Sequence, residues 1–298
     1  MGILRFLVRY GYAPLFFIGF IGAAVWMVAN GASKIWLAGL LLPAIALSFI
    51  AERIAPFEEN WNHSKGDTTR DTLHAVINEL TNAASIAAIP ILAAMTHGFD
   101  VWPGEWPLWA QLVMTILIAD FGITMAHYAS HKIEALWRLH AVHHSVERMY
   151  GFNGLMKHPL HQAIELTAGT TPLLLMGMPL EIGALLGFAA AIQLLLQHSN
   201  TEMRVGPLIY LWAGAPGHRH HHLAHKVKGD VNFGLFLTIW DVLLGTGKFA
   251  SSAHIRSGTV GLAGVDQYPE AYVAQLTEPF RTRRPSSGPV PVRSDGQL

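Results

Sequence analysis

The 298-residue chain contains no cysteine. Disulfides, cysteine-rich zinc sites, iron–sulfur clusters and thiol catalysis are therefore excluded, and a bound metal ion must be held by histidine, carboxylate or amide side chains. Charged residues are also scarce, because they make up 13% of the chain, about half of their usual share in soluble domains. The net charge is zero, which argues against a basic surface for nucleic acid.

Hydrophobic residues, in contrast, are abundant, at 51% of the chain. Apolar runs of about 20 residues can cross a bilayer as helices. We therefore expect an all-α integral membrane protein with four to six transmembrane helices. The candidate spans are residues 12–30, 35–55, 76–97, 107–127 and 162–198, the last being a helical hairpin that turns at residues 177–181. The first run is too long for a signal peptide and lacks a clear cleavage site, so we expect it to be retained as an anchor.

Lysine and arginine are distributed unevenly among the segments between these spans. With the N-terminus placed in the cytoplasm, Lys34 is the one residue of the 20 Lys and Arg that falls on the opposite side. Because cytoplasmic loops carry an excess of positive charge, the sequence predicts an even number of spans with both termini in the cytoplasm. This pattern and the lack of cysteine fit a bacterial inner-membrane protein, and an organellar membrane remains open.

Histidine is the residue type with the most informative placement. Thirteen of the 17 histidines lie between His127 and His225. The first group, HYASH, places two histidines four residues apart, which is about 40° around a helix. The second and third groups, HAVHH and HRHHH, share the spacing H-x-x-H-H. In chain order the three groups contain His127 and His131; His140, His143 and His144; and His218, His221 and His222.

This repeated spacing predicts a metal centre. Eight or more neutral imidazoles can complete the nitrogen ligands of two divalent cations, and imidazole suits iron, zinc, copper and nickel. The second nitrogen of each ring needs a hydrogen-bond acceptor. Nearby acidic candidates are Asp120, Glu134, Glu147, Glu165 and Asp241. Because two groups lie outside the predicted spans and the first ends one of them, we expect a histidine-lined di-metal cap on the cytoplasmic side.

The ordered groups H-x3-H, H-x2-HH and H-x2-HH resemble those of the fatty acid hydroxylase/sterol desaturase superfamily of membrane di-iron enzymes. The resemblance covers about residues 107–247. It includes LWRLHAVHHS at residues 136–145, KHPL at 157–160, QHSN at 197–200 and NFGLFLTIWDVLLGT at 232–246. Departures from common members are Thr124, Tyr128 and His220, which leave the ligand spacing intact.

The resemblance implies a ninth ligand between the second and third groups. We choose His198, because it ends a predicted transmembrane helix on the same side as the others, and rank His225 below the third-group histidines. Residues expected to orient the ligands or to lie at the substrate entrance are Asp120, His158, His161, Asn200 and Asp241. The histidines expected to be ordinary polar residues are His63, His74, His97 and His254.

The resemblance also implies a domain organisation and a function. Residues 1–100 would form N-terminal transmembrane helices, residues 101–250 the fatty acid hydroxylase-like catalytic domain, and residues 251–298 a C-terminal extension that is disordered from about residue 276. The expected activity is O2-dependent hydroxylation or desaturation of a lipid C–H bond, with two iron ions as cofactor and with no histidine as acid–base catalyst. The lipid could be a sterol, a fatty-acyl lipid, a carotenoid or a related amphiphile.

No fused electron-transfer domain is evident in the sequence, so electrons would come from a separate ferredoxin-like or cytochrome b5-like donor with its reductase. Two other classes of protein remain open on the residues alone. A membrane b-type cytochrome or a metal transporter would place histidines or acidic residues deep within several helices. A zinc hydrolase would keep the ligands and change the metal, but no open-site carboxylate base is obvious.

Overall fold

The computed structural model describes residues 2–95, 98–99, 101–224, 229–250, 255–262, 265 and 268–281. Over these residues the chain is helical, with three isolated β-bridges. The α-helices are α1 (Ile3–Ala29), α2 (Ile35–Ile54), α3 (Thr68–Ala87), α4 (Ile89–Met95), α5 (Leu108–Lys132), α6 (Glu134–His144), α7 (Pro159–Met176), α8 (Leu180–His198), α9 (Ala215–His221), α11 (Ile239–Leu244) and α12 (Tyr272–Thr277). The 3-10 segments are η1 (Glu59–Asn62), η2 (Gly151–Leu155), η3 (Gly206–Tyr210) and η4 (Glu278–Phe280).

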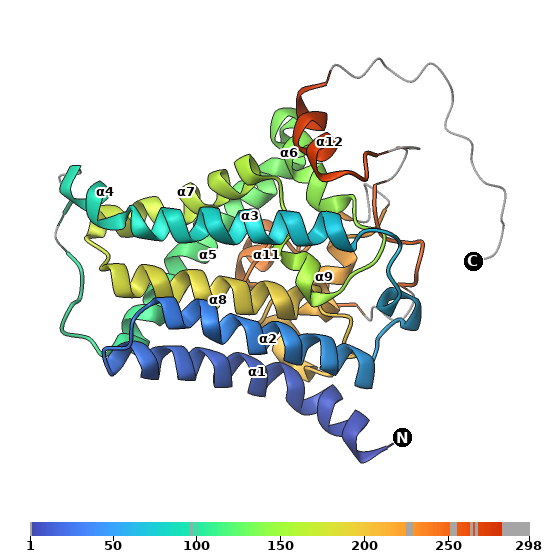
Figure 1. Ribbon diagram of the computed structural model, residues 1–298, viewed down its shortest axis with the longest axis horizontal. Coiled ribbons are helices and arrows are strands. Elements are labelled where there is room, and N and C mark those ends of the chain that lie inside the picture. The colour runs from blue at the N-terminus through green and yellow to red at the C-terminus, as the bar shows by residue number, and fades with distance from the viewer. Residues whose placement is uncertain are drawn as a thin grey trace.

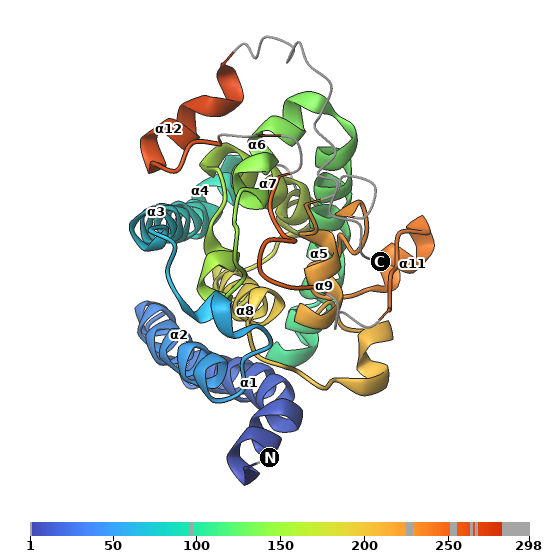
Figure 2. The same cartoon turned by 90° about the vertical axis from the view of Figure 1, so that its right-hand side faces the viewer.

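Six long helices, α1, α2, α3, α5, α7 and α8, lie side by side and run in alternating directions (Figure 1). The end-on view places α8 in the middle of the other five (Figure 2). One end of the bundle therefore collects the N-terminus, the connections α2–α3 and α5–α7, and the end of α8. These are the segments that the charge distribution assigns to a single side of the membrane.

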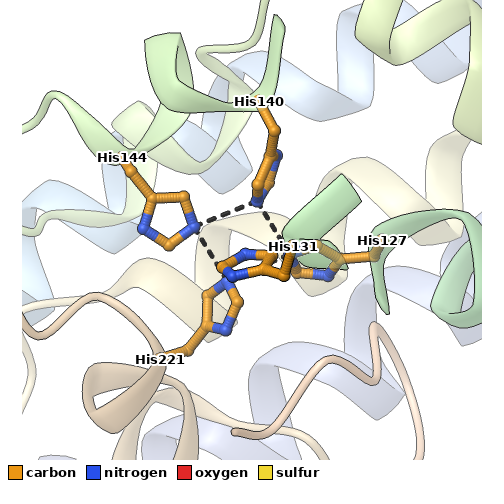
Figure 3. A group of neighbouring side chains, drawn as sticks. All are labelled: His127, His131, His140, His144 and His221. Atoms are coloured by element: carbon orange, nitrogen blue, oxygen red, sulfur yellow. Dashed lines mark hydrogen bonds between the residues drawn. The ribbon is translucent and has the colours of Figure 1, made fainter. Parts of the chain in front are cut away.

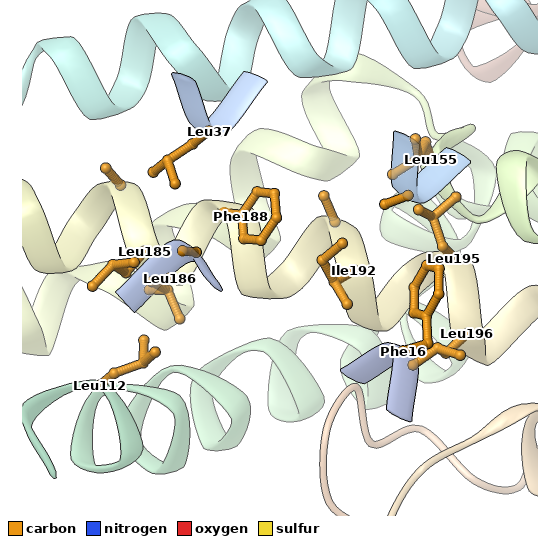
Figure 4. Packing of buried hydrophobic residues seen from close by; sticks show 14 of the residues in the cluster. Phe16, Leu37, Leu112, Leu155, Leu185, Leu186, Phe188, Ile192, Leu195 and Leu196 are labelled. Atoms are coloured by element: carbon orange, nitrogen blue, oxygen red, sulfur yellow. The ribbon is translucent and has the colours of Figure 1, made fainter. Parts of the chain in front are cut away.

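Helix α8 forms the centre of the hydrophobic core. Its apolar side chains point in all directions around the helix and pack against α1, α2, α5 and η2 (Figure 4). The labelled core residues are Phe16, Leu37, Leu112, Leu155, Leu185, Leu186, Phe188, Ile192, Leu195 and Leu196. A helix that is apolar on every face is expected in the interior of a bundle.

The predicted hairpin between residues 162 and 198 is present, and its turn has a local cause. Helix α7 ends at Met176 and is capped by Gly177, whose φ of +91° lies in the left-handed region that glycine adopts readily. The N–H of Met178 then donates to the carbonyl of Leu173, which closes the end of the helix. Pro179 directly precedes α8 as its N-cap residue, with extended backbone angles.

Four helices, α1, α2, α5 and α8, are long and apolar enough to span a membrane. This agrees with the lower number expected from the sequence, and the chain is a multi-pass membrane protein. The start of the predicted span 76–97 was wrong. The helix in this region, α3, begins at Thr68 and carries buried polar side chains, among them Asp71 and His74. It then gives way to the short helix α4. The first half of the hairpin, α7, is also absent from the four.

Helices α5 and α7 approach each other closely at two glycines. A Cβ atom added to Gly122 would overlap the carbonyl oxygen of Ala168 and would lie 2.9 Å from the Cα of Gly169. A Cβ on Gly169 would in turn lie 3.0 Å from the carbonyl oxygen of Ala119. Small residues let the backbones of membrane helices come into contact. This crossing holds the histidine-bearing end of α5 against the bundle.

We predict that Gly122→Ala lowers the stability of the protein in detergent by about 1–3 kcal/mol, because the helices must separate to admit the methyl group. Unfolding in detergent, followed by circular dichroism, measures the change. The control is Gly22→Ala on α1, where an added Cβ meets no atom within 4 Å. Equal stability of the two variants would contradict the close crossing.

Candidate metal centre

All nine histidines proposed as ligands come together at one end of the bundle. The last turns of α5 carry His127 and His131, and α8 ends at His198. Helix α6 carries the second histidine group, and α9 with the residue after it carries the third. Four segments that are far apart in the sequence thus converge, because α5 and α8 run in the same direction and α6 and α9 lie across their ends.

The nine rings form two separate groups of nitrogen atoms. The five-histidine cluster contains His127, His131, His140, His144 and His221 (Figure 3), and the four-histidine cluster contains His143, His198, His218 and His222. Within each cluster, one nitrogen of every ring lies within 4.8 Å of all the others. Each H-x-x-H-H group serves both clusters, because its first and last histidines share one helix face and its middle histidine lies on the next.

Nitrogen distances within the clusters match those around a metal ion. In the five-histidine cluster, Nε2 of His127 lies 2.9 Å from those of His140 and His221, and Nε2 of His144 lies 3.0 Å from the same two atoms. In the four-histidine cluster the corresponding distances are 3.1–3.2 Å. Neighbouring nitrogens around an octahedral ion with bonds of about 2.1 Å would lie about 3.0 Å apart.

Hydrogen bonds on the opposite side of the rings determine which nitrogen carries the proton. Nδ1 of His127 lies 2.8 Å from the carbonyl oxygen of Phe233, and Nδ1 of His221 lies 2.9 Å from that of Val231. A carbonyl accepts only, so Nδ1 holds the proton in both rings and Nε2 of a neutral ring is bare. The two bare Nε2 atoms lie 2.9 Å apart, and their lone pairs repel unless a cation lies between them.

The four-histidine cluster repeats this arrangement. Nδ1 of His143 donates to the carbonyl of Met156 at 2.7 Å, and Nδ1 of His198 lies 3.3 Å from the carbonyl of Leu194. Their Nε2 atoms lie 3.1 Å apart. In each cluster, therefore, the unprotonated nitrogens point toward a centre of that cluster, as the nitrogens of metal ligands do.

Burial keeps these rings neutral. Desolvation, together with the neighbouring rings, lowers the pKa of each cluster histidine outside the membrane-spanning helices well below its ordinary value. These residues are His140, His143, His144, His218, His221 and His222. A neutral imidazole is the form that binds metal. A set of neutral nitrogen donors without thiolates fits iron, zinc, copper or nickel.

Two of the residues expected to orient the ligands act through the backbone that follows α9. Asp120 accepts hydrogen bonds from the N–H groups of residues 235, 236 and 237 and from Nε1 of Trp240. Asp241 accepts from the N–H groups of Phe233 and Gly234. Phe233 supplies the carbonyl that binds His127. The two carboxylates thus hold in place the loop that orients this ring.

The other three candidates have different surroundings. His161 is buried, and its ring lies 4.4 Å from that of His140 between centroids. His158 caps α7 and lies 3.1 Å from the carbonyl of Leu276, so it contacts neither cluster. Asn200 contacts no cluster ring among its hydrogen bonds and instead binds the backbone of Glu58.

The histidines that we did not expect to bind metal have other surroundings. His220 points away from both clusters, with Nε2 3.1 Å from the carbonyl of Ala250. His63 is exposed, whereas His74 is buried between the carbonyl of Lys157 and the side chain of Gln275. His97, His225 and His254 lie outside the described residues.

Sequence reasoning missed one carboxylate at the site. Oδ1 of Asp230 lies 3.0 Å from Nδ1 of His131, and Oδ2 lies 2.9 Å from Nζ of Lys132. Hydrogen bonds from His131 and Lys132 lower the pKa of this carboxyl to about 2, although burial opposes the shift. Asp230 precedes the motif at residues 232–246, and the sequence contains no spacing that links it to α5.

A cavity of about 390 Å³ opens onto the five-histidine cluster. Three cluster histidines line it, namely His131, His144 and His221. The remaining wall comes from α6 and from described residues that follow α9 in the chain, and it includes Glu134, Trp137, Arg138, Leu223, Gly229, Leu262 and Tyr268. None of the four-histidine cluster lines this cavity. The cavity therefore reaches the five-histidine cluster from beyond the ends of the membrane-spanning helices.

Comparison with known proteins assigns the chain to a family. A family model described as fatty acid hydroxylase matches residues 112–246. An ornithine lipid hydroxylase of Rhizobium tropici is 34% identical over 255 residues, which cover 83% of this chain and 76% of that protein. The chain belongs to the fatty acid hydroxylase family. It is therefore an oxidoreductase, as the histidine groups predicted.

More distant relatives of the chain are members of the same superfamily. An alkylglycerol monooxygenase of Danio rerio is 28% identical over 49% of this chain and 31% of that protein. A probable Delta(7)-sterol 5(6)-desaturase of Neurospora crassa is 27% identical over 56% of this chain and 49% of that protein. No solved structure matches the chain. These relationships do not favour the cytochrome or transporter alternative.

We predict that His221→Ala and His222→Ala each lower the amount of iron bound per chain, because each removes a ring from a different cluster. Metal analysis of the purified protein measures the loss. The matched control is His220→Ala, which removes the buried ring between them that belongs to neither cluster. If His220→Ala lost as much iron as the other two, the loss would reflect disruption of α9 and not the removal of ligands.

Proposed function

We propose that this protein is an O2-dependent di-iron lipid hydroxylase. The observation that carries the proposal is the convergence of bare Nε2 atoms in two neighbouring clusters of neutral imidazoles. Nine histidines would hold the two irons, five at one position and four at the other. When bound, the pair of ferrous ions supplies the reduction of O2 and the oxidation of an unreactive C–H bond.

Hydroxylation is preferred to desaturation because the ornithine lipid hydroxylase aligns with most of both chains. We extend this to the substrate and propose a membrane lipid with a polar amino-acid headgroup. The cavity suits an amphiphile, because its wall combines Trp137, Leu262 and Tyr268 with the charged residues Glu134 and Arg138. The sterol, carotenoid and simple fatty-acyl substrates become alternatives that a product analysis separates.

The protein would contribute positioning and exclusion of water. Asp120 and Asp241 hold the loop whose carbonyl groups fix the rings of His127 and His221. The buried rings leave bare nitrogens for the metal. A substrate in the cavity would lie beside the five-histidine cluster and away from the four-histidine cluster.

We further propose that the histidine-bearing end of the bundle faces the cytoplasm of a bacterial cell, with both termini on that side. The distribution of lysine and arginine supports this orientation. It would allow a separate ferredoxin-like or cytochrome b5-like protein, with its reductase, to deliver electrons to the cap.

Lipid analysis of a bacterium that makes ornithine lipids tests this function. We expect cells expressing the protein to accumulate a lipid that has gained one oxygen atom, with the label of isotopically labelled O2. The matched negative control is the double variant His143→Ala, His221→Ala, which removes one ring from each cluster. A product that has lost two hydrogen atoms and gained no oxygen would instead establish a desaturase, and purified protein with zinc alone would contradict the di-iron proposal.

Filling the cavity should separate substrate access from metal binding. We predict that Leu262→Trp lowers product formation by more than about tenfold, because the larger side chain displaces the substrate from its reactive position. The iron content should not change, because Leu262 lines the cavity without belonging to either cluster. Leu208→Trp at an exposed position on η3 is the control. Full activity of the Leu262 variant would show that substrate reaches the metal by another route.

A further inference from the structure

Glu52 is a buried carboxylate that the histidine motifs do not include. It lies near the end of α2, is 2% exposed, and is outside the residues that match the family model. Its Oε1 atom accepts the backbone N–H of Gly151 at 2.6 Å and the backbone N–H of Asn200 at 3.1 Å. One oxygen atom therefore joins η2 to the segment that follows α8.

Each of these two segments determines the position of one histidine ring of the four-histidine cluster. Asn200 lies two residues after His198, which ends α8. Met156 directly follows η2, and its carbonyl oxygen accepts the Nδ1–H of His143. The Nε2 atoms of His143 and His198 lie 3.1 Å apart. A change in the distance between η2 and the end of α8 would therefore change the distance between these two ligands.

The fit between η2 and the end of α8 is close. A Cβ added to Gly154 would lie 2.7 Å from Nδ1 of His198 and would overlap the carbonyl of Leu194. A Cβ added to Gly151 would lie 2.5 Å from the carbonyl of Leu195 and 3.2 Å from Oε1 of Glu52. Glycine at both positions lets η2 lie directly against the helix. The ring of His198 consequently has little freedom to move toward η2.

Arg219 attaches α9, the third segment that carries histidines of this cluster, to the residues that follow α8. It lies between cluster residues on α9, is 1% exposed, and donates to the carbonyls of Ser199 and Thr201 at 2.8 Å each. Its guanidinium lies 3.9 Å from the ring centre of Phe57, in the segment that follows α2. The turn at residues 199–201 thus joins α2, η2 and α9.

The five-histidine cluster has different supports. His127 and His221 are oriented by the carbonyls of Phe233 and Val231, whose loop is held by Asp120 and Asp241. None of these hydrogen bonds involves Glu52. The two clusters are therefore anchored by separate buried carboxylates on separate helices.

We propose that Glu52 is a positioning residue for the four-histidine metal site, and that it places His143 and His198 at ligand distance by holding η2 against the end of α8. This inference rests on the proposed di-iron centre. It assigns the N-terminal hairpin α1–α2 a role in assembling the second metal position, beyond that of a membrane anchor.

Iron analysis of purified full-length variants after loading with ferrous iron tests the proposal. Glu52→Ala should lose about half of the iron bound by the wild type, because the four-histidine site fails while the five-histidine site remains. Glu52→Gln should retain the iron, because its amide oxygen can accept the same two N–H bonds. Adding His221→Ala to Glu52→Ala should remove the remaining iron, whereas adding His222→Ala should have no further effect.

Two controls separate positioning from general loss of stability and from failure of the di-iron proposal. Leu185→Ala should be less stable than the wild type and still bind the full amount of iron, since this buried side chain lies near the start of α8, at the opposite end of the helix from His198. Hydrogen exchange gives a readout without metal, in which the amides of Gly151 and Asn200 should exchange faster in Glu52→Ala and normally in Glu52→Gln.

The outcomes are distinct. Full iron in Glu52→Ala, or equal loss from both sites as judged by the double variants, would overturn the role of Glu52. Wild-type protein that binds no iron would overturn the di-iron centre itself, and the exchange of the two amides would still report whether Glu52 joins η2 to α8.

Discussion

The structure depends on placing unprotonated imidazole nitrogens about 3 Å from one another in a buried site. Lone pairs at this distance repel, so the arrangement needs a cation at the centre and a restraint on the far side of each ring. Backbone carbonyls provide that restraint for His127, His143 and His221. These three carbonyls belong to irregular segments packed against the helix ends, whereas His198 uses the carbonyl of Leu194 within its own helix.

Irregular segments next to a membrane domain need their own support, and here buried carboxylates provide it. Asp120 accepts four hydrogen bonds from the loop at residues 235–240, and Asp241 and Glu52 each accept two from backbone N–H groups. A buried carboxylate is costly unless its oxygens are satisfied. Backbone N–H groups in a loop are costly to bury for the same reason. A hydrogen bond between a carboxylate and a backbone N–H group thus offsets the desolvation cost of both.

The helices of the bundle determine where this polar cap can form. Helices α5 and α8 act both as apolar membrane helices and as carriers of ligands in their last turns. Their positions are set by close packing, through Gly122 and Gly169 at the α5–α7 crossing and through the burial of α8 on all sides. The two histidine clusters lie at the ends of these helices, and the cavity opens onto the five-histidine cluster from the cap.

Much of this organisation is determined by the sequence alone. Apolar runs predict most of the membrane helices, the residues around Gly177 predict the hairpin turn, and histidine spacing predicts eight of the nine rings that meet in the two clusters, the ninth being implied by the family resemblance. These features are local, because they depend on helical periodicity or on the conformation of one residue. The predicted third span is not among the four apolar helices, because α3 begins at Thr68 and so includes polar residues such as Asp71 and His74.

Tertiary structure alone decided how the histidines divide between two clusters and which groups orient them. Asp230 meets His131 across 99 positions in the sequence, and Glu52 meets Asn200 across 148. No periodicity connects residues at such separations, because their contact depends on how whole helices pack. The sequence thus determined the type of chemistry through the ligands, and the fold determined the geometry through carboxylates and carbonyls that have no motif.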